Sequence, residues 1–180
     1  MEFHRILNGR YVHSYIINMA VQIKNFKQEL LTFVVILNGG IYTAYSILKM
    51  FNDKELDLII KHLGLSSYDN RIDFGDERVI ITSPLTDSFR DVEDRDVWII
   101  DDTVDTGATL KAARQIVEGG NPKSIHTAVL VDKIKSRLEH KQPKPDVVGY
   151  TYEGDGFLVG CGMGHGERFR QLDCLYELEV

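Results

Sequence analysis

The chain has 180 residues and a mass of 20.5 kDa, a length typical of one globular domain. Its 43% hydrophobic and 27% charged residues are those of an ordinary folded protein with a buried core. The formal net charge of −6 argues against nucleic acid as a partner, which needs a concentrated basic face. No apolar stretch approaches the roughly 18 residues that span a bilayer, so no membrane partner is expected.

The cysteine pattern indicates a reducing compartment. Cys161 and Cys174 are the two cysteines, and they do not form a CxxC pair. No signal peptide is recognised ahead of the first helix pattern. We therefore expect a cytoplasmic protein with two free thiols.

The first third of the chain alternates between helix and strand patterns. Apolar residues spaced by three and four predict an amphipathic helix over 12–30. The β-branched run at 32–37 predicts a buried strand. After the turn sequence NGG, residues 41–51 predict a second helix, and an extended run follows at 56–65.

The alternation continues to about residue 145. Residues 78–82, 97–100 and 124–131 read as strands, and 109–120 as a helix closed by its glycines. Strands that alternate with helices predict a parallel sheet with helices on both faces.

The end of the chain has a different pattern, with short strand-like pieces at 146–152, 157–162 and 175–180 and no long helix between them. We therefore expect one α/β domain over 1–180. Its Rossmann-like parallel-sheet core would cover about 11–145, and a small hood would come from about 1–10 and 146–180.

The stretch VWIIDDTVDTGATL places three acids and two threonines directly after an apolar run. Ligands of a parallel sheet lie beyond the carboxyl ends of its strands, so Asp101, Asp102 and Asp105 are expected at that edge. The free amides and hydroxyls of 106–109 would form a phosphate nest at the start of the next helix. Acids that bind hydroxyls or Mg²⁺ beside such a nest predict a phosphorylated sugar as ligand.

The same residues also fit other patterns. Two acids followed by Asp105 match the magnesium-diphosphate motif of prenyl-transferring enzymes, but that motif lies on a long helix in all-helical proteins. A nucleotide-binding P-loop would need a lysine where Ala108 stands. The non-functional interpretation is a solvated acidic turn that caps a helix.

IIDDTVDTGAT resembles the phosphoribosyl pyrophosphate signature of the type I phosphoribosyltransferases. Other segments resemble the hypoxanthine-guanine branch of that family. VVILNGG resembles its Leu-Lys-Gly-Gly loop, SSYDN its Ser-Tyr flexible loop, and LVDK the strand end with the base-recognition lysine. PDVVGY, FLVGCG and ERFRQL follow in the family's order, so the resemblance covers nearly all the chain from Phe33 on and implies the phosphoribosyltransferase fold.

The resemblance implies a donor site built from the signature and two flanking loops. Asp101 and Asp102 would hold the ribose hydroxyls and the metal, and Asp105 would be a catalytic proton acceptor near purine N7. The 5′-phosphate would lie on Thr106, Gly107, Ala108 and Thr109. Pyrophosphate would contact the backbone of Leu37, Asn38 and Gly39 and the side chain of Arg170.

The resemblance also implies a base site and a closing loop. Lys133 would be the second catalytic residue and would bind the oxygen at purine C6. Phe157 would stack on the purine ring, and the Leu158 backbone would read the base edge. Ser67 and Tyr68 would lie on a flexible loop that closes over the reacting centre and excludes water.

The implied activity is purine salvage with Mg²⁺ as cofactor. The enzyme would transfer 5-phosphoribosyl from phosphoribosyl pyrophosphate to a 6-oxopurine, hypoxanthine or guanine, with xanthine as a further candidate. A homo-oligomer, dimer or tetramer, is also implied. Two alternatives stay open: a regulatory protein that keeps the fold and binds RNA or DNA, and an enzyme for another nucleobase such as uracil or orotate.

Two positions depart from the family's usual pattern. Asn38 stands where the family usually has lysine or arginine, and Gly164 where it usually has an aspartate beside the metal and base pocket. We expect both to affect base preference and catalytic strength more than the fold. Gly164→Asp is expected to tighten metal-dependent donor binding, provided that Gly164 does not need a positive φ angle.

Overall fold

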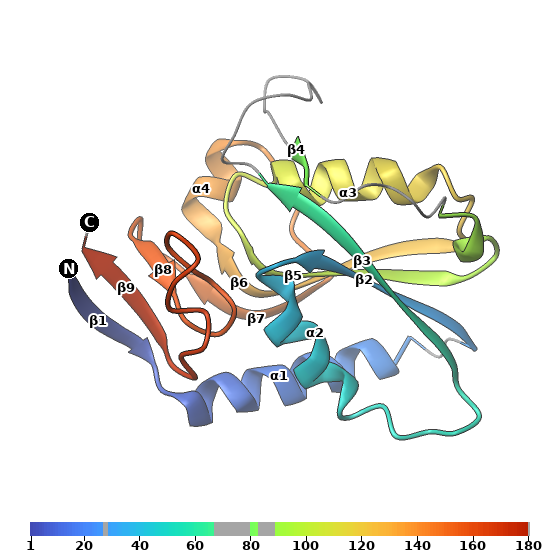
Figure 1. Cartoon of the computed structure of the whole chain (residues 1–180), viewed down its shortest axis with the longest axis horizontal. Coiled ribbons are helices and arrows are strands. Elements are labelled where there is room, and N and C mark those ends of the chain that lie inside the picture. Colours follow the sequence, from blue (N-terminus) through green and yellow to red (C-terminus); the bar gives the residue numbers. More distant parts are fainter. Residues whose placement is uncertain (27–28, 67–79, 83–88, 180) are drawn as a thin grey trace.

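The computed structural model describes residues 1–26, 29–66, 80–82 and 89–179. A six-stranded sheet forms the centre of the molecule, and a smaller sheet lies at one end of it (Figure 1). Within the described ranges, no helix is long and apolar enough to cross a membrane.

Five neighbouring strands of the large sheet run parallel, in the order β3-β2-β5-β6-β7. They are β2 (Leu30–Leu37), β3 (Asp57–Ser66), β5 (Asp96–Val104), β6 (Ser124–Lys133) and β7 (Val147–Tyr152). The expected parallel α/β core is therefore confirmed. A two-residue strand, β4 (Ile80–Ile81), pairs antiparallel with β3, whereas the alternation had predicted only parallel strands.

Helices cover both faces of this sheet, because its central strands are apolar on both sides. α1 (Gly9–Lys24) and α2 (Gly40–Leu48) lie on one face, and α3 (Ala108–Glu118) and the 3-10 helix η1 (Phe89–Val92) on the other (Figure 1). Alternate residues of β5 point to opposite faces: Trp98 and Ile100 pack under α1 and α2, and Val97 and Ile99 under α3.

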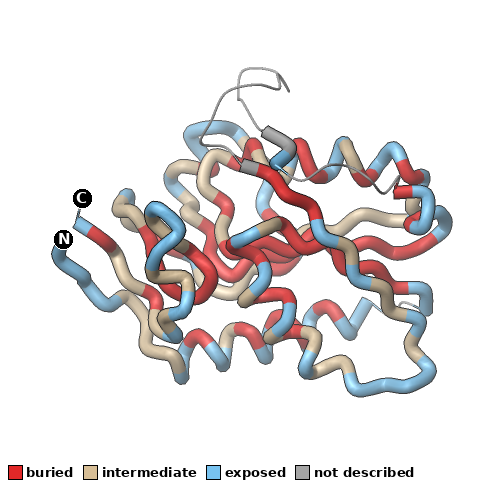
Figure 2. Tube along the Cα trace, in the orientation of Figure 1, coloured by how far each residue is buried: buried red, intermediate tan, exposed pale blue. Residues whose placement is uncertain are grey.

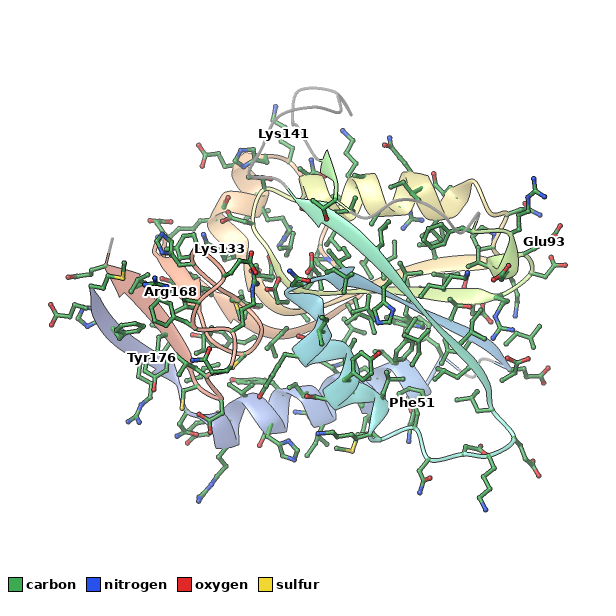
Figure 3. All side chains as sticks on the ribbon, viewed as in Figure 1. Phe51, Glu93, Lys133, Lys141, Arg168 and Tyr176 are labelled. Atoms are coloured by element: carbon green, nitrogen blue, oxygen red, sulfur yellow. The ribbon has the colours of Figure 1, made fainter. Side chains whose placement is uncertain are left out.

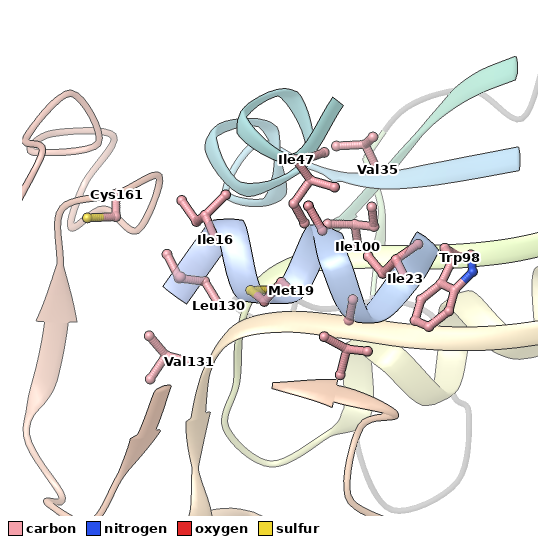
Figure 4. Close-up of a cluster of buried hydrophobic side chains, with 14 of the residues drawn as sticks. Ile16, Met19, Ile23, Val35, Ile47, Trp98, Ile100, Leu130, Val131 and Cys161 are labelled. Atoms are coloured by element: carbon pink, nitrogen blue, oxygen red, sulfur yellow. The ribbon is translucent and has the colours of Figure 1, made fainter. Parts of the chain in front are cut away.

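The buried side chains concentrate in these central strands and in the inner faces of the helices (Figure 2). In the cluster below α1, Met19 and Ile23 approach Ile100 and Trp98 of β5 (Figure 4). A core of this kind fixes the strand ends in space, which is what a site at the sheet edge requires.

The first helix is shorter than its apolar periodicity predicted, because it ends at Lys24 and not near residue 30. Asn8 caps its start by accepting a hydrogen bond from the Tyr11 amide at 3.1 Å. Phe26 lies beyond the helix but packs edge-on against Trp98, with ring centroids 4.9 Å apart. Leu30 already begins β2. Phe26 and Leu30 are 45% and 42% exposed, so the apolar spacing beyond Lys24 does not continue the buried face of the helix.

The two ends of the chain form the hood as a three-stranded antiparallel sheet (Figure 1). Its strands are β1 (Glu2–Leu7), β9 (Leu175–Glu179) and β8 (Phe157–Val159), with β9 in the middle. The expected boundary at residue 146 is wrong, because β7 pairs in parallel with β6 inside the core sheet. β7 is the edge strand of the core sheet, and no helix has to follow it. The helix pattern in the sequence therefore stops before the last strand of the core.

Candidate active site

A cavity of about 700 Å³ lies at the carboxyl ends of β2, β5 and β6, between the core sheet and the hood. All the predicted site residues line it except Ser67 and Tyr68, which lie outside the described residues. Lys133 lies at the end of β6, where the core faces the hood (Figure 3). The cavity is thus at the sheet edge where ligands of parallel sheets bind.

The acid pair lies inside a strand and not after it. β5 continues to Val104, four residues beyond the strand predicted at 97–100, so Asp101 and Asp102 are part of the sheet. Their exposed fractions are only 5% and 9%. The Asp102 amide donates to Asp101 Oδ1 at 2.9 Å, and the Thr103 amide donates to Asp102 Oδ1 at 2.7 Å.

The two carboxyl groups are buried next to each other, and the positive charge of Arg170 acts on Asp102. Burial and the neighbouring Asp102 carboxylate raise the pKa of Asp101 well above its usual range. Burial also raises the pKa of Asp102, although hydrogen bonds from Asp101 and from the Thr103 amide act in the opposite direction. The pair therefore favours a shared proton until a cation or hydroxyl-rich ligand arrives.

Asp101→Asn should stabilise the free protein at neutral pH. A carboxyl whose pKa is raised by folding binds more protons when folded, so its contribution to stability falls as pH rises above the unfolded pKa. The asparagine side chain carries no charge, so its burial does not cost stability at neutral pH. It can keep the hydrogen bonds that Asp101 makes with the Asp102 amide and with the Asp102 side chain. We expect a gain of about 0.5–2 kcal/mol in the free energy of unfolding, as single stabilising changes commonly give, together with weaker donor binding.

Urea unfolding of the Asp101→Asn variant at several pH values would measure this effect. The gain should shrink as pH falls through the raised folded-state pKa of Asp101 and should be lost below the unfolded pKa of aspartate, near 3.8. Asp155→Asn is a matched control, because the Asp155 side chain is 78% exposed. Equal unfolding free energies for Asp101→Asn and the parent at pH 7 would contradict the prediction.

Gly39 allows the β2–α2 loop to lie directly on the acid pair. A Cβ atom at this position would stand 1.9 Å from Asp102 Oδ2, so any side chain would displace the carboxylate. The preceding peptide, Leu37–Asn38, is cis. Leu37, Asn38 and Gly39 line the cavity beside Asp102.

The start of α3 lies at the cavity, at the residues where a phosphate nest was predicted. Gly107 has a φ angle of +87°, a conformation that glycine adopts without strain, and α3 begins at the next residue. The first amides of a helix have no intrahelical partners and attract anions. The first turn of α3 carries no acidic residue, and 106–109 line the cavity.

The two predicted catalytic side chains contact each other across the ends of neighbouring strands. Lys133 Nζ lies 2.6 Å from Asp105 Oδ2, and the Lys133 side chain is only 13% exposed. Burial would raise the pKa of Asp105, but hydrogen bonds from Lys133 and Ser136 lower it below its usual value. Asp105 is therefore held as an anion while its lysine partner lies within reach of the cavity.

The hood supplies the opposite wall. Phe157 and Leu158 of β8 line the cavity, and the Phe157 ring packs edge-on against His165 with centroids 5.2 Å apart. An aromatic ring held in this way offers a flat apolar surface for a planar base. Lys133 lines the same cavity from the core side.

Arg170 also lines the cavity. It is held by the carboxylate of Glu167, a residue that no sequence motif had indicated. Its Nη1 donates to the Gly162 carbonyl at 2.8 Å, and its Nη2 and Nε approach the Glu167 carboxylate at 3.1 and 3.3 Å. The Arg170 guanidinium lowers the pKa of Glu167, and a hydrogen bond from Asn38 adds to this effect. The spacing of three residues between Glu167 and Arg170 was the available sequence signal.

Gly164 is more constrained than its sequence context indicated. Its φ angle is not positive, so the backbone at this position does not require glycine, as the prediction for Gly164→Asp had assumed. A Cβ atom there, however, would stand 2.8 Å from Arg170 Cγ and 2.9 Å from the Arg168 carbonyl oxygen. The expectation that Gly164→Asp tightens donor binding is therefore withdrawn on steric grounds.

We now expect Gly164→Asp to weaken donor binding, because the new side chain displaces Arg170 and strains a backbone carbonyl. Overpacking of this kind costs about 1–3 kcal/mol. Calorimetric titration with phosphoribosyl pyrophosphate and Mg²⁺ would measure it, with Gly164→Ala as the control that adds Cβ without charge. Tighter binding by Gly164→Asp than by the parent would contradict the steric argument.

The fold and this site together define a protein that binds a sugar phosphate at the edge of a parallel sheet. The chain matches the phosphoribosyl transferase domain family over residues 5–164. It therefore belongs to the phosphoribosyltransferases, the class of pentosyltransferase that the signature resembles.

Individual relatives agree with this assignment. The chain is 32% identical to hypoxanthine phosphoribosyltransferase of Haemophilus influenzae over 171 residues, which cover 93% of this chain and 90% of that protein. It is 29% identical to hypoxanthine-guanine phosphoribosyltransferase of Staphylococcus epidermidis, with coverages of 89% and 84%. The crystal structure of a hypoxanthine phosphoribosyltransferase from Staphylococcus aureus superposes with a TM-score of 0.81 at 26% identity, with coverages of 98% and 91%.

Proposed function

We propose that this chain is a purine salvage enzyme that transfers 5-phosphoribosyl from phosphoribosyl pyrophosphate to a 6-oxopurine, hypoxanthine or guanine. The observation that carries the proposal is one cavity lined by the start of α3, the buried acid pair and the Lys133–Asp105 pair. The similarity to hypoxanthine phosphoribosyltransferase of Haemophilus influenzae supports the choice of base.

The donor lies along the core side of the cavity. Its 5′-phosphate rests on the amides and hydroxyls of 106–109, and its ribose hydroxyls bond to Asp101 and Asp102. The pyrophosphate group lies against the 37–39 backbone, with Arg170 beside it. Arg170 already pairs with Glu167 through Nε and Nη2, so pyrophosphate competes with that carboxylate for the guanidinium.

The base lies between Phe157 and Lys133. The Lys133 ammonium donates to the oxygen at purine C6, which selects oxo over amino purines because an amino group offers no acceptor there. The purine N9 forms a bond to C1 of the ribose as the bond from C1 to pyrophosphate breaks. Asp105 accepts the proton that leaves purine N7, and nearby carboxylates favour the positive charge that develops on the ribose ring.

The residues present fit a magnesium ion. Asp101 and Asp102 are two adjacent buried carboxyl groups whose pKa values are raised, although the positive charge of Arg170 acts on Asp102, and Mg²⁺ prefers hard oxygen ligands. We propose that they hold Mg²⁺, directly or through water, with the donor. When bound, the ion supplies charge neutralisation for the departing pyrophosphate.

We further propose that the enzyme is a cytoplasmic homo-oligomer, a dimer or tetramer. Support for self-association comes from exposed apolar side chains on adjoining elements, Ile41 and Tyr45 of α2 and Ile60 of β3. Tyr45 also stacks on His62 of β3, which makes this surface continuous. Multi-angle light scattering would test the assembly. The free thiols of Cys161 and Cys174 agree with a reducing compartment.

Incubation with Mg²⁺, phosphoribosyl pyrophosphate and a panel of bases would test the activity. We expect inosine or guanosine monophosphate, with xanthine as a weaker acceptor and no product from adenine. Nucleotide from uracil or orotate alone would indicate a phosphoribosyltransferase for another base. Absence of any nucleotide, together with RNA or DNA binding, would favour the regulatory alternative.

A further inference from the structure

Residues 153–156 connect β7, the edge strand of the core sheet, to β8 of the hood. Phe157, which lines the cavity from the hood, is the residue directly after this connection and begins β8. Lys133, which lines the cavity from the core, is paired in register with Tyr152, the last residue of β7. The position of Phe157 relative to Lys133 therefore depends on how this one short connection is held.

The Tyr152 side chain links the core sheet to the hood at this connection. Tyr152 is only 4% exposed. Its hydroxyl donates a hydrogen bond to Glu177 Oε2 and accepts one from the Gly156 amide at 3.3 Å. Glu177 lies on β9, the central strand of the hood, and is paired in register with Leu158 of β8. One hydroxyl thus contacts both the hood sheet and the residue that precedes Phe157.

The chemistry of this contact makes it directional. Burial and the hydrogen bond to Glu177 raise the pKa of Tyr152 to about 12, so the phenol keeps its proton at neutral pH. The hydroxyl proton is directed to the Glu177 carboxylate, which leaves the oxygen lone pairs for the Gly156 amide. Hydrogen bonds to a charged acceptor are stronger than those between neutral groups, so this contact can hold the connection in one place.

The sequence of the connection leaves room for this hydrogen bond. A Cβ atom at Gly154 would overlap the Tyr152 hydroxyl, and a Cβ atom at Gly156 would overlap the Glu177 carboxylate. Neither glycine has a positive φ angle. The space that Tyr152 and Glu177 occupy, and not the backbone conformation, therefore accounts for the missing side chains, and the connection is shaped around their hydrogen bond.

A second contact between the connection and the core is weaker. Lys135 of α4 (Ile134–Glu139) lies 3.4 Å from Asp155 of the connection. The two side chains are 60% and 78% exposed, and exposed ion pairs contribute little to stability because water and salt screen them. The buried Tyr152 hydroxyl is therefore the contact that fixes the connection.

We propose that Tyr152 and Glu177 are positioning residues for the base, which hold Phe157 at the spacing from Lys133 that a purine ring needs. The inference rests on the proposed function, because it concerns the base that Phe157 and Lys133 bind there. Tyr152 and Glu177 are not among the described residues that line the cavity, so they act through the connection and do not contact the base. The donor side of the cavity is built from α3 and the ends of β2 and β5, so it does not depend on this connection.

Tyr152→Phe tests the inference because it removes the hydroxyl and keeps the ring. We expect the KM for hypoxanthine to rise roughly tenfold, the effect of losing one hydrogen bond to a charged group. Donor affinity, measured by calorimetric titration with phosphoribosyl pyrophosphate and Mg²⁺, should stay at the parent value. Glu177→Ala should have the same effect, and the double variant should add little to either change, because both remove one shared contact. Glu177→Gln keeps an oxygen acceptor and should restore most of the parent KM.

Two control variants change neighbouring groups outside this contact. Tyr150→Phe removes a hydroxyl from the same strand and keeps the ring contact with Tyr15, whose centroid lies 5.7 Å away. Asp155→Asn changes an exposed side chain of the connection itself. Both variants should keep the parent KM for the base.

Amide hydrogen exchange of the free protein gives a readout that does not depend on turnover. Tyr152→Phe and Glu177→Ala should speed exchange at 154–158 and leave exchange at the start of α3 unchanged. An unchanged KM for the base in Tyr152→Phe would overturn the inference. A rise in KM matched by an equal loss of donor affinity would also overturn it, because a general loss of structure would then explain both. A parent protein that forms no nucleotide would overturn the proposed function instead, and exchange at 154–158 would still show whether the Tyr152 hydroxyl holds the connection.

Discussion

Asp105→Asn should lower turnover by about 10²–10⁴-fold, the usual contribution of a positioned proton acceptor. The amide keeps the shape of the carboxylate but cannot take the proton from the purine. It also leaves the Lys133 ammonium, which is 2.6 Å away and largely buried, with a neutral partner. Donor binding should change much less, because the phosphate nest and the acid pair are untouched.

Steady-state kinetics with hypoxanthine and guanine, and calorimetric titration with donor and Mg²⁺, would separate the two effects. Asp155→Asn is again a suitable control, because Asp155 pairs with exposed Lys135 at 3.4 Å and does not line the cavity. A turnover within about threefold of the parent, well short of the expected loss, would show that Asp105 is structural.

Removal of divalent metal should abolish nucleotide formation, and added Mg²⁺ or Mn²⁺ should restore it. The departing pyrophosphate and the two buried carboxylates need a cation for the reaction to proceed in this cavity. Burial raises the pKa of Asp101 and Asp102, so a metal has to displace protons from them. Metal-dependent donor binding should therefore weaken as pH falls.

Nucleotide formation in the presence of chelator would measure the dependence of the reaction on divalent metal. Calorimetry in buffers of different ionisation enthalpy would measure the number of protons that the metal displaces. Asp102→Asn should weaken metal binding, so that more Mg²⁺ is needed for activity, and should reduce the number of protons released. Undiminished synthesis in chelator would contradict the assigned role of the acid pair.

The sequence alone predicted the parts of this protein that depend on consecutive residues. The apolar run before Asp101 indicated a buried strand, because a strand covered on both faces has no polar alternation. Gly107, between a strand pattern and a helix pattern, indicated a turn with free amides. The order of these features carried the family resemblance, which the match over residues 5–164 confirms.

The boundaries of elements were predicted less well where the tertiary structure decides them. The first helix ends at Lys24 although apolar spacing continues, and the residues that continue the spacing, Phe26 and Leu30, are exposed. The strand at 147–152 belongs to the core because it pairs with β6, and pairing partners are not encoded in a local pattern.

The contacts of the site were decided by the tertiary structure alone. Residues 105 and 133 are 28 positions apart, and they meet because β5 and β6 are neighbours whose carboxyl ends share one edge. The space around Gly164 depends on where Arg170 and the Arg168 carbonyl lie. Such contacts arise from the packing of whole elements against each other. Residues that line the cavity could therefore be predicted from sequence and family resemblance, whereas their partners, burial and pKa values could not.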